Sequence, residues 1–367
     1  MFPDVCTEIE AAREPISKIN SGSKLIYLAN EQSDSMASPA PTLSTDFTAK
    51  AGYVGSSLVP KLLELDYEVT VLDLMMYGED VLDDHPKLKK IKGDIRNKSL
   101  LEEIIPGHDI VIHLACISND PSFELNPTLG KSINLDAFEP LVEISRKNKV
   151  NRFVYASSSS VYGIKSEKNV TEDMKLEPLT DYSKFKGDCE KILNSYKSDE
   201  FIATTIRPST VCGYARRQRL DLVVNILTNH AYHNRKIKVF GGDQLRPNVH
   251  IDDMVDSYLA VLRASTDKIN GEIFNVGFKN QTVNELANDV KTIIGEDVKI
   301  IQTSSHDNRS YHVSSEKIKN VLGFSTKRTV KDAVSDLKNS FEKNLIPDSM
   351  DNKKYFNIKT MNSINLK

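Results

Sequence analysis

The sequence predicts an α/β protein built on a doubly wound parallel sheet, with a smaller α/β substrate lobe toward the C-terminus. Two observations support this prediction. Strand-like runs alternate with helical segments between residues 52 and 209, and one run, DIVIHLA at residues 109–115, is almost continuously apolar. Such alternation gives right-handed crossovers and a parallel sheet with helices on both faces, and a continuous apolar run is typical of a strand buried on both faces. Ligands of such sheets bind at the carboxyl ends of the strands.

The first expected helix begins at Gly52, because Val54, Leu58, Leu62 and Leu65 recur at helical spacing. The elements expected after it are strands at 67–74, 88–94, 109–115, 152–158 and 201–209, and helices at 134–148 and 182–196. Beyond residue 209 the rhythm becomes irregular. There we expect helices near 221–233, 252–264, 283–294 and 329–343, and strands at 237–241, 272–277 and 298–303.

The composition argues against several classes of function. The formal charge of the 367-residue chain is −3, so we expect no general attraction to nucleic acid or to an anionic membrane. No run reaches the ~18 apolar residues of a membrane span. The four cysteines lack C-x-x-C spacing, which favours reduced thiols in a cytoplasmic protein and indicates neither a disulfide framework nor a metal site.

Tyr182 and Lys186 form a Y-x-x-x-K pair on an expected helix. Residues at i and i+4 share one helix face, so the ammonium can favour the phenolate and make the tyrosine a usable acid or base. The alternative is an ordinary exposed face that is rich in lysine.

The segment ASSSSVYG, residues 156–163, follows an expected buried strand. Four serines are poor strand formers, and a hydroxyl at this edge of the sheet can hydrogen-bond a reacting group of a ligand. The alternative is a polar turn. The two candidates support each other, because the end of one strand and the start of the next helix meet in this topology.

Ser158, Tyr182 and Lys186, together with the strand–turn–helix around Gly52 and Gly55, resemble the extended short-chain dehydrogenase/reductase family. These enzymes are NAD-dependent epimerases and dehydratases of sugar nucleotides with a Rossmann sheet, and the resemblance covers about residues 48 to 345. It implies that Ser158 is the catalytic hydroxyl and that Tyr182 takes the proton of a sugar hydroxyl. It also implies that Lys186 binds the nicotinamide ribose and lowers the pKa of the tyrosine.

The same resemblance implies a set of NAD-binding positions. Asp73 is the acid that would bind the adenosine ribose and favour NAD over NADP, and Asn134 matches an active-site asparagine. The remaining implied contacts are the turn residues Ala49, Gly52, Tyr53, Val54 and Gly55, the adenine-side pair Asp94 and Ile95, and Leu114 and Ala115 under the dinucleotide. For the nucleotide-sugar substrate, the resemblance implies Ser158, Asn225, Arg246 and Arg309, the two arginines facing the diphosphate.

The chain departs from the family at its cofactor turn. Ala49 stands in place of the first glycine, and no obvious apolar strand precedes it. Three explanations are open for the central strand: residues 42–47 fill it, KLIYLAN at residues 24–30 fills it with a long loop after it, or the segment before residue 48 has replaced the original one. The abrupt end of the resemblance favours the third.

A second departure concerns the reaction. Dehydratases of the family carry Asp-Glu directly after the catalytic hydroxyl, where this chain has Ser159 and Ser160. We therefore expect an epimerase that acts through a transient keto-sugar. The alternatives are a ketoreductase and a non-catalytic binding protein with a degraded cofactor turn. Family members often dimerise through helices that correspond to 134–148 and 182–197, so a homodimer is expected.

The expected organisation has four parts. Residues 1–45 are an atypical N-terminal extension that is partly loop, and residues 46–209 form the NAD-binding domain. Residues 210–345 are mainly the substrate-binding lobe, interleaved with late elements of the sheet. Residues 346–367 are polar and are expected to form a loose tail.

Overall fold

The computed structural model describes residues 23–28, 52–78, 80–167, 169–304 and 312–364. Its main feature is a seven-stranded sheet in the order β10-β6-β5-β4-β1-β2-β3, with every neighbouring pair parallel. These strands are β1 (Lys24–Leu28), β2 (Glu68–Asp73), β3 (Leu88–Lys92), β4 (Ile110–His113), β5 (Arg152–Ala156), β6 (Ile202–Pro208) and β10 (Ile273–Val276). The predicted doubly wound α/β fold is confirmed.

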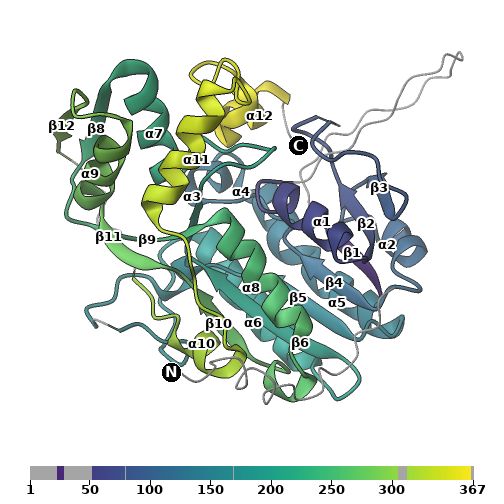
Figure 1. Cartoon of the computed structure of the whole chain (residues 1–367). Coiled ribbons are helices and arrows are strands. Elements are labelled where there is room, and N and C mark those ends of the chain that lie inside the picture. Colours follow the sequence, from purple (N-terminus) through teal and green to yellow (C-terminus); the bar gives the residue numbers. More distant parts are fainter. Residues whose placement is uncertain (1–22, 29–51, 79, 168, 305–311, 365–367) are drawn as a thin grey trace, which may run out of the picture.

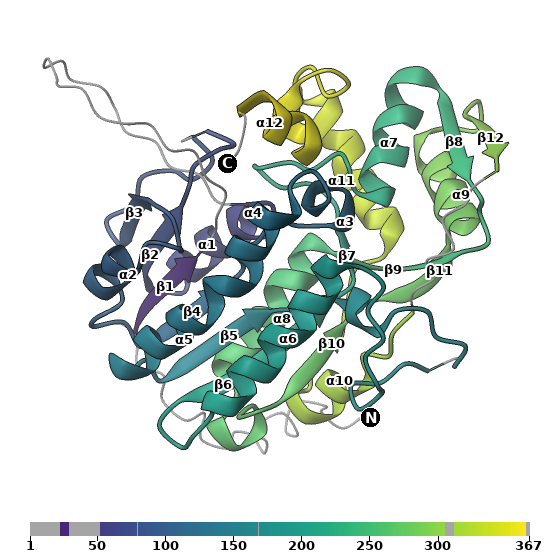
Figure 2. The ribbon, with the colours of Figure 1, turned by 180° about the vertical axis from the view of Figure 1, so that it is seen from behind.

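Helices cover both faces of this sheet, as Figures 1 and 2 show from opposite sides. One face packs against α2 (Lys98–Ile104), α5 (Phe138–Lys147) and α6 (Asp181–Tyr196). The other packs against α1 (Gly55–Glu64), α8 (Ile251–Arg263) and α10 (Glu316–Leu322). The short elements between β4 and α5 are α3 (Asp120–Phe123), α4 (Pro127–Lys131) and η1 (Ser132–Asp136).

The central strand is β1, which pairs with β2 through Leu25 and Val69 and with β4 through Leu25 and Ile110. Leu25, Ile26 and Leu28 are fully buried, as a central parallel strand requires. The strand of the second explanation, within KLIYLAN, therefore takes the central position. Residues 42–47 lie outside the described residues.

A smaller lobe stands beside the sheet, above the carboxyl ends of its strands (Figure 1). Its core lies among α7 (Val223–Asn234), α9 (Val283–Ile294), α11 (Val330–Glu342) and the parallel pair β8 (Lys236–Phe240) and β12 (Lys299–Thr303). A three-stranded sheet of β7 (Thr210–Cys212), β9 (Leu245–His250) and β11 (Lys279–Thr282) joins the lobe to the main sheet. Three single turns complete the elements: η2 (Ser159–Tyr162), η3 (Thr266–Lys268) and η4 (Lys353–Tyr355).

The C-terminal segment differs from the loose tail that was expected. It forms the helix α12 (Asn357–Ile364), and Asn357, Thr360 and Met361 are buried. Met361 belongs to the same apolar cluster as the residues of α5 and α6. Apolar residues at the spacing of a helix thus dock a segment whose overall composition is polar.

Candidate active site

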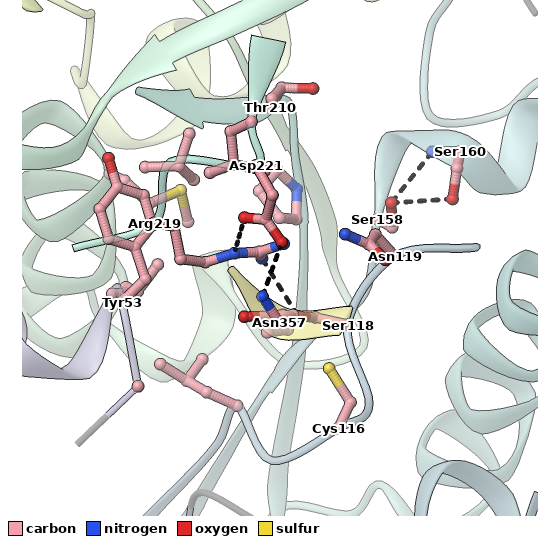
Figure 3. A pocket seen from close by; sticks show the side chains of 18 of the residues that line it. Tyr53, Cys116, Ser118, Asn119, Ser158, Ser160, Thr210, Arg219, Asp221 and Asn357 are labelled. Carbon is pink, nitrogen blue, oxygen red and sulfur yellow. Dashed lines mark hydrogen bonds and ion pairs between the residues drawn. The ribbon is translucent and has the colours of Figure 1, made fainter. Parts of the chain in front are cut away.

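A pocket of about 440 Å³ opens at the carboxyl ends of the parallel strands (Figure 3). Its walls come from the start of α1, from the segments that follow β2, β4, β5 and β6, and from the first residue of α12. The polar and charged residues that line it are Asp73, Tyr77, Ser118, Asn119, Asp120, Ser157, Ser158, Ser159, Ser160, Tyr182, Lys186, Ser209, Thr210, Arg217, Arg219, Asp221, Arg246, Tyr258 and Asn357. The pocket therefore lies where ligands of doubly wound sheets bind.

Helix α6 presents Tyr182 and Lys186 to this pocket. The helix begins in a capping box, in which the Thr180 hydroxyl accepts from the backbone N–H of Ser183 and the Ser183 hydroxyl accepts from that of Thr180. Tyr182 therefore lies in the first turn and Lys186 one turn later, on the same face. The Lys186 ammonium donates to the backbone oxygen of Ala156 at 2.6 Å and lies 6.0 Å from the centroid of the Tyr182 ring.

The electrostatic setting of Tyr182 differs from the expectation. Burial raises the pKa of Tyr182 above its ordinary value, and the nearby Cys116 and Asp120 raise it further, while Arg219 and a hydrogen bond with Ser158 lower it. The net shift of this pKa is therefore upward instead of downward as expected, because loss of water around the phenol dominates.

Ser158 lies two residues after the end of β5 and is the N-cap residue of the turn η2. Its hydroxyl accepts from the Ser160 backbone N–H at 3.2 Å and lies 2.9 Å from the Ser160 hydroxyl. Because the strand end and the first turn of α6 meet at the pocket, the structure brings Ser158, Tyr182 and Lys186 together.

The start of α1 fits a phosphate. Gly52, Tyr53 and Val54 line the pocket, and Gly55 begins the helix. No side chain caps this N-terminus and no acidic residue lies in its first turn, so the partial positive charge of the helix end is available to an anion. The backbone at Gly52 faces open space, where an added Cβ would meet no atom within 4 Å. Ala49 lies outside the described residues.

Of the two acidic residues expected to contact NAD, Asp73 and Asp94, only Asp73 lines the pocket. Asp73 ends β2, lines the pocket and accepts from the Met75 backbone N–H at 2.7 Å. Asp94 instead accepts from the backbone and side chain of Arg96, at 2.8 and 3.0 Å, and Ile95 is buried in the apolar core. Asp73 fits a ribose-binding acid, whereas Asp94 and Ile95 are not among the residues that line the pocket.

The two residues after β4 that were expected to lie under the dinucleotide also differ in position. Leu114 lines the pocket, whereas Ala115 is buried in the core. Asn134 also lies behind the wall, where its side-chain oxygen accepts from the Ile117 N–H at 2.8 Å and its amide donates to the Ile117 oxygen at 3.0 Å. Asn134 therefore holds the wall of the pocket rather than facing it.

Among the expected substrate residues, Arg246 lines the pocket and Arg309 lies outside the described residues. Asn225 is fully buried, and its amide donates to the Tyr53 hydroxyl at 3.0 Å and to the Arg219 oxygen at 2.8 Å. The Tyr53 hydroxyl in turn donates to the Gly213 oxygen at 2.6 Å. Asn225 thus ties α7 to the start of α1, behind the pocket wall.

Sequence reasoning missed the charged group between β7 and α7. Arg219 pairs with Asp221 at 3.0 and 3.2 Å and donates to the Ser118 hydroxyl at 3.1 Å (Figure 3). Arg217 and Asn357 also line the pocket. The run RRQRLD, residues 216–221, was the available signal, since a dense basic stretch just before a helix near the sheet edge suggests an anion site. Nothing in the local pattern marked Asn357.

In the described part of the chain, no group of three or more histidine, cysteine, aspartate or glutamate residues could hold a metal ion. No helix within those residues combines the length and the apolar character that crossing a bilayer requires.

The fold and the pocket together define a dinucleotide-binding α/β protein of the doubly wound type. The sequence pattern described as the NAD dependent epimerase/dehydratase family matches residues 49–277, which is more than half of the chain. The chain belongs to this family, and NAD is its cofactor. The residues at the start of α1 and at the end of β2 would hold the dinucleotide.

Individual relatives and structures agree with this assignment. The chain is 28% identical over 298 residues to a UDP-glucose 4-epimerase of Lactobacillus helveticus, covering 76% of this chain and 90% of the relative. It is 32% identical over 256 residues to a putative UDP-glucose 4-epimerase of Methanocaldococcus jannaschii, covering 68% and 81%. The UDP-glucose 4-epimerase of Thermotoga maritima, solved with UDP-glucose, has a similar fold, with a TM-score of 0.74, 23% identity and coverage of 88% and 99%.

Proposed function

We propose that the protein is an NAD-dependent epimerase of a nucleotide-activated sugar, acting through a transient keto-sugar. The observation that supports this most is the presence of Tyr182, Ser158 and Lys186 in one pocket with the start of α1. The relatives named as UDP-glucose 4-epimerases support the same reaction class.

Bound NAD would supply the hydride acceptor and, in the return step, the hydride donor. The protein's own residues would handle the proton. Tyr182 takes the proton from the sugar hydroxyl as the carbon is oxidised and returns it when the ketone is reduced from the other face. Ser158 hydrogen-bonds the same oxygen, and Lys186 provides a positive charge beside the phenol.

Arg246 is the proposed contact for the substrate diphosphate, because its side chain lines the pocket from β9. Arg309 is proposed as its partner in that role on the strength of the family resemblance. For Asn225 we propose an indirect role, since its amide holds the Tyr53 hydroxyl instead of facing the pocket. Two guanidiniums would give charge-assisted contacts to the diphosphate.

A dehydratase is disfavoured in this proposal. That reaction needs acid and base groups beside the catalytic hydroxyl to move protons at neighbouring carbons. Ser159 is buried, and the hydroxyl of Ser160 lies 2.9 Å from that of Ser158. Hydroxyls at these two positions do not supply the carboxylic acid and carboxylate that such proton transfers use.

The test uses purified protein and a panel of UDP- and dTDP-sugars, without added cofactor. An epimerase interconverts two stereoisomers and releases NAD only when it is denatured. Conversion that depends on added NADH or NADPH would instead identify a ketoreductase. Protein that carries no dinucleotide and converts no sugar nucleotide would identify a non-catalytic binding protein.

We further propose a homodimer that forms through α5 and α6, in a cytoplasmic protein. The three cysteines in the described residues, Cys116, Cys189 and Cys212, are free thiols, which agrees with a reducing compartment. Light scattering of the purified protein would give twice the mass of the 41.2 kDa chain if the dimer forms.

A further inference from the structure

Asn357, the first residue of α12, joins three separate parts of the pocket wall, although it is only 2% exposed. Its side-chain oxygen accepts from the Tyr77 hydroxyl at 2.9 Å and from the Arg217 guanidinium at 2.6 Å. Its amide donates to the Ser118 hydroxyl at 3.1 Å, and its backbone N–H donates to the Asp221 carboxylate at 3.1 Å. Figure 3 shows Asn357 between Arg219 and Ser118 on the wall of the pocket.

The contact with Arg217 matters because of where this arginine lies. Its backbone N–H donates to the Ser56 hydroxyl at 3.2 Å, in the first turn of α1. Its guanidinium carbon lies 3.4 Å from the centroid of the Tyr77 ring, which follows β2. Arg217 is 4% exposed and lines the pocket. The backbone of this arginine therefore contacts the first turn of α1, while its buried guanidinium lies over the Tyr77 ring. A guanidinium and a helix N-terminus both favour an anion such as a phosphate.

The segment that carries Asn357 is itself anchored in the small lobe. The Ser349 hydroxyl donates to the Asn229 side chain at 2.7 Å, and the Leu220 N–H donates to the Tyr355 oxygen at 2.8 Å. Asn229 lies on α7, and Leu220 belongs to the RRQRLD run. The C-terminal segment is thus fixed at several points before it reaches the pocket.

We propose that the segment from residue 346 to residue 364 forms the wall on the NAD side of the pocket, and that Asn357 is a positioning residue. By this account Asn357 holds Arg217 where its guanidinium meets the diphosphate of NAD. The inference rests on the proposed function only in taking NAD as the ligand. It does not depend on which sugar is bound or on whether that sugar is epimerised.

The experiment measures the dissociation constant of NAD, without any sugar nucleotide, for the wild type, N357L, R217M and the double variant. N357L is expected to weaken NAD binding about tenfold, which is the size of a lost hydrogen bond to a charged group. The double variant should bind NAD no more weakly than R217M alone, because Asn357 acts through Arg217. Raising the salt concentration should weaken NAD binding in the wild type more than in R217M.

The matched control is N362L, since Asn362 is exposed on the same helix. Its NAD affinity should equal that of the wild type. If N357L does not fold, Y77F decides the question, because it removes the hydroxyl that meets Asn357 and keeps the ring under Arg217; it should weaken NAD binding about threefold.

Unchanged NAD affinity in N357L, or in Y77F where N357L does not fold, would overturn the proposal, as would losses that add in the double variant. A wild type that binds NAD but inverts no sugar would reject the proposed function and leave this inference standing.

Discussion

Tyr182 is a partly buried phenol whose neighbours act on its pKa in opposite directions. Desolvation raises this pKa most, and Cys116 and Asp120 raise it further. Arg219 and the hydrogen bond with Ser158 lower it. The proposed role as a base therefore depends on groups that favour the phenolate, and Lys186 on the same helix face is the proposed one.

The substitution Y182F tests this role. It removes the group that takes the proton and leaves the ring, so kcat should fall about a thousandfold, within the range typical of a lost general base. The NAD released on denaturation should stay the same. The matched control is Y196F at the far end of α6, where the hydroxyl bonds Glu139 and Glu143. A Y182F enzyme with near wild-type kcat would show that another group moves the proton.

At the scale of elements, α6 is tied to β6 by a buried ion pair. Arg207 donates to Glu190 at 3.0 and 2.7 Å, and the Ser157 hydroxyl also donates to this carboxylate. Ser157 precedes Ser158, the proposed catalytic hydroxyl, so this pair supports the strand end that carries the pocket residues Ser157 and Ser158. Removing one partner of such a pair leaves a buried charge without compensation.

We predict that E190Q lowers the free energy of unfolding by about 3–5 kcal/mol. Urea denaturation followed by circular dichroism would measure the loss. The control is D188N, which breaks the exposed pair of Asp188 with Lys191 on the same helix and should change stability by about 0.5 kcal/mol or less. Equal losses in the two variants would mean that the buried ion pair contributes no more to the free energy of unfolding than the exposed one.

The strand β4 carries a histidine whose burial makes stability depend on pH. Burial, and to a smaller extent the Lys186 ammonium, lower the pKa of His113 from 6.5 to about 3. The unfolded chain binds a proton below its ordinary value of 6.5, while the folded protein does not. The stability that neutral His113 contributes is therefore fully present above pH 6.5 and is lost as the pH falls toward about 3.

For this group the loss should be about 1.4 kcal/mol per pH unit below pH 6.5. Urea denaturation at pH 7 and pH 5 should show a smaller difference for H113L than for the wild type. H85Q is the control, because His85 lies exposed on the surface. If the pH dependence of stability in H113L equals that of the wild type, His113 is not its source.

The elements predicted best from the sequence are those whose own residues show a clear hydrophobic pattern. The apolar run at 109–115 is β4, and the spacing in residues 182–196 is α6. The role of Asn357 was not predictable, because its partners follow β2, follow β4 and precede α7 and meet only in the folded chain. The inward position of Asn225 was likewise invisible, since a polar residue on a helix does not reveal which face it occupies.

For the whole molecule, the placement of β1 decides the fold. Sequence reasoning identified residues 24–30 as a possible strand but did not choose it, because the abrupt end of the family resemblance before residue 48 favoured a replaced N-terminal segment. In the structure, Lys24–Leu28 pairs with β2 and β4 and fills the centre of the sheet, a long-range pairing that no local pattern reveals.

The substitution I26A tests the placement of β1. Ile26 is fully buried in the central strand, so the truncation should cost about 2–5 kcal/mol of unfolding free energy. I301A on β12 is the control, because Ile301 is 36% exposed at the periphery and should cost about 1 kcal/mol or less. Denaturant titration compares the two. A negligible effect of I26A would argue against β1 as the centre of the sheet.

The central claim is that this protein inverts a sugar carbon by moving a hydride to and from bound NAD while Tyr182 moves only a hydroxyl proton. The most direct measurement is nuclear magnetic resonance of the reaction in deuterated water with a sugar-nucleotide panel and no added cofactor. The account predicts an inverted product with no deuterium at any sugar carbon. Deuterium at a sugar carbon, or no conversion of any member of the panel, would contradict it.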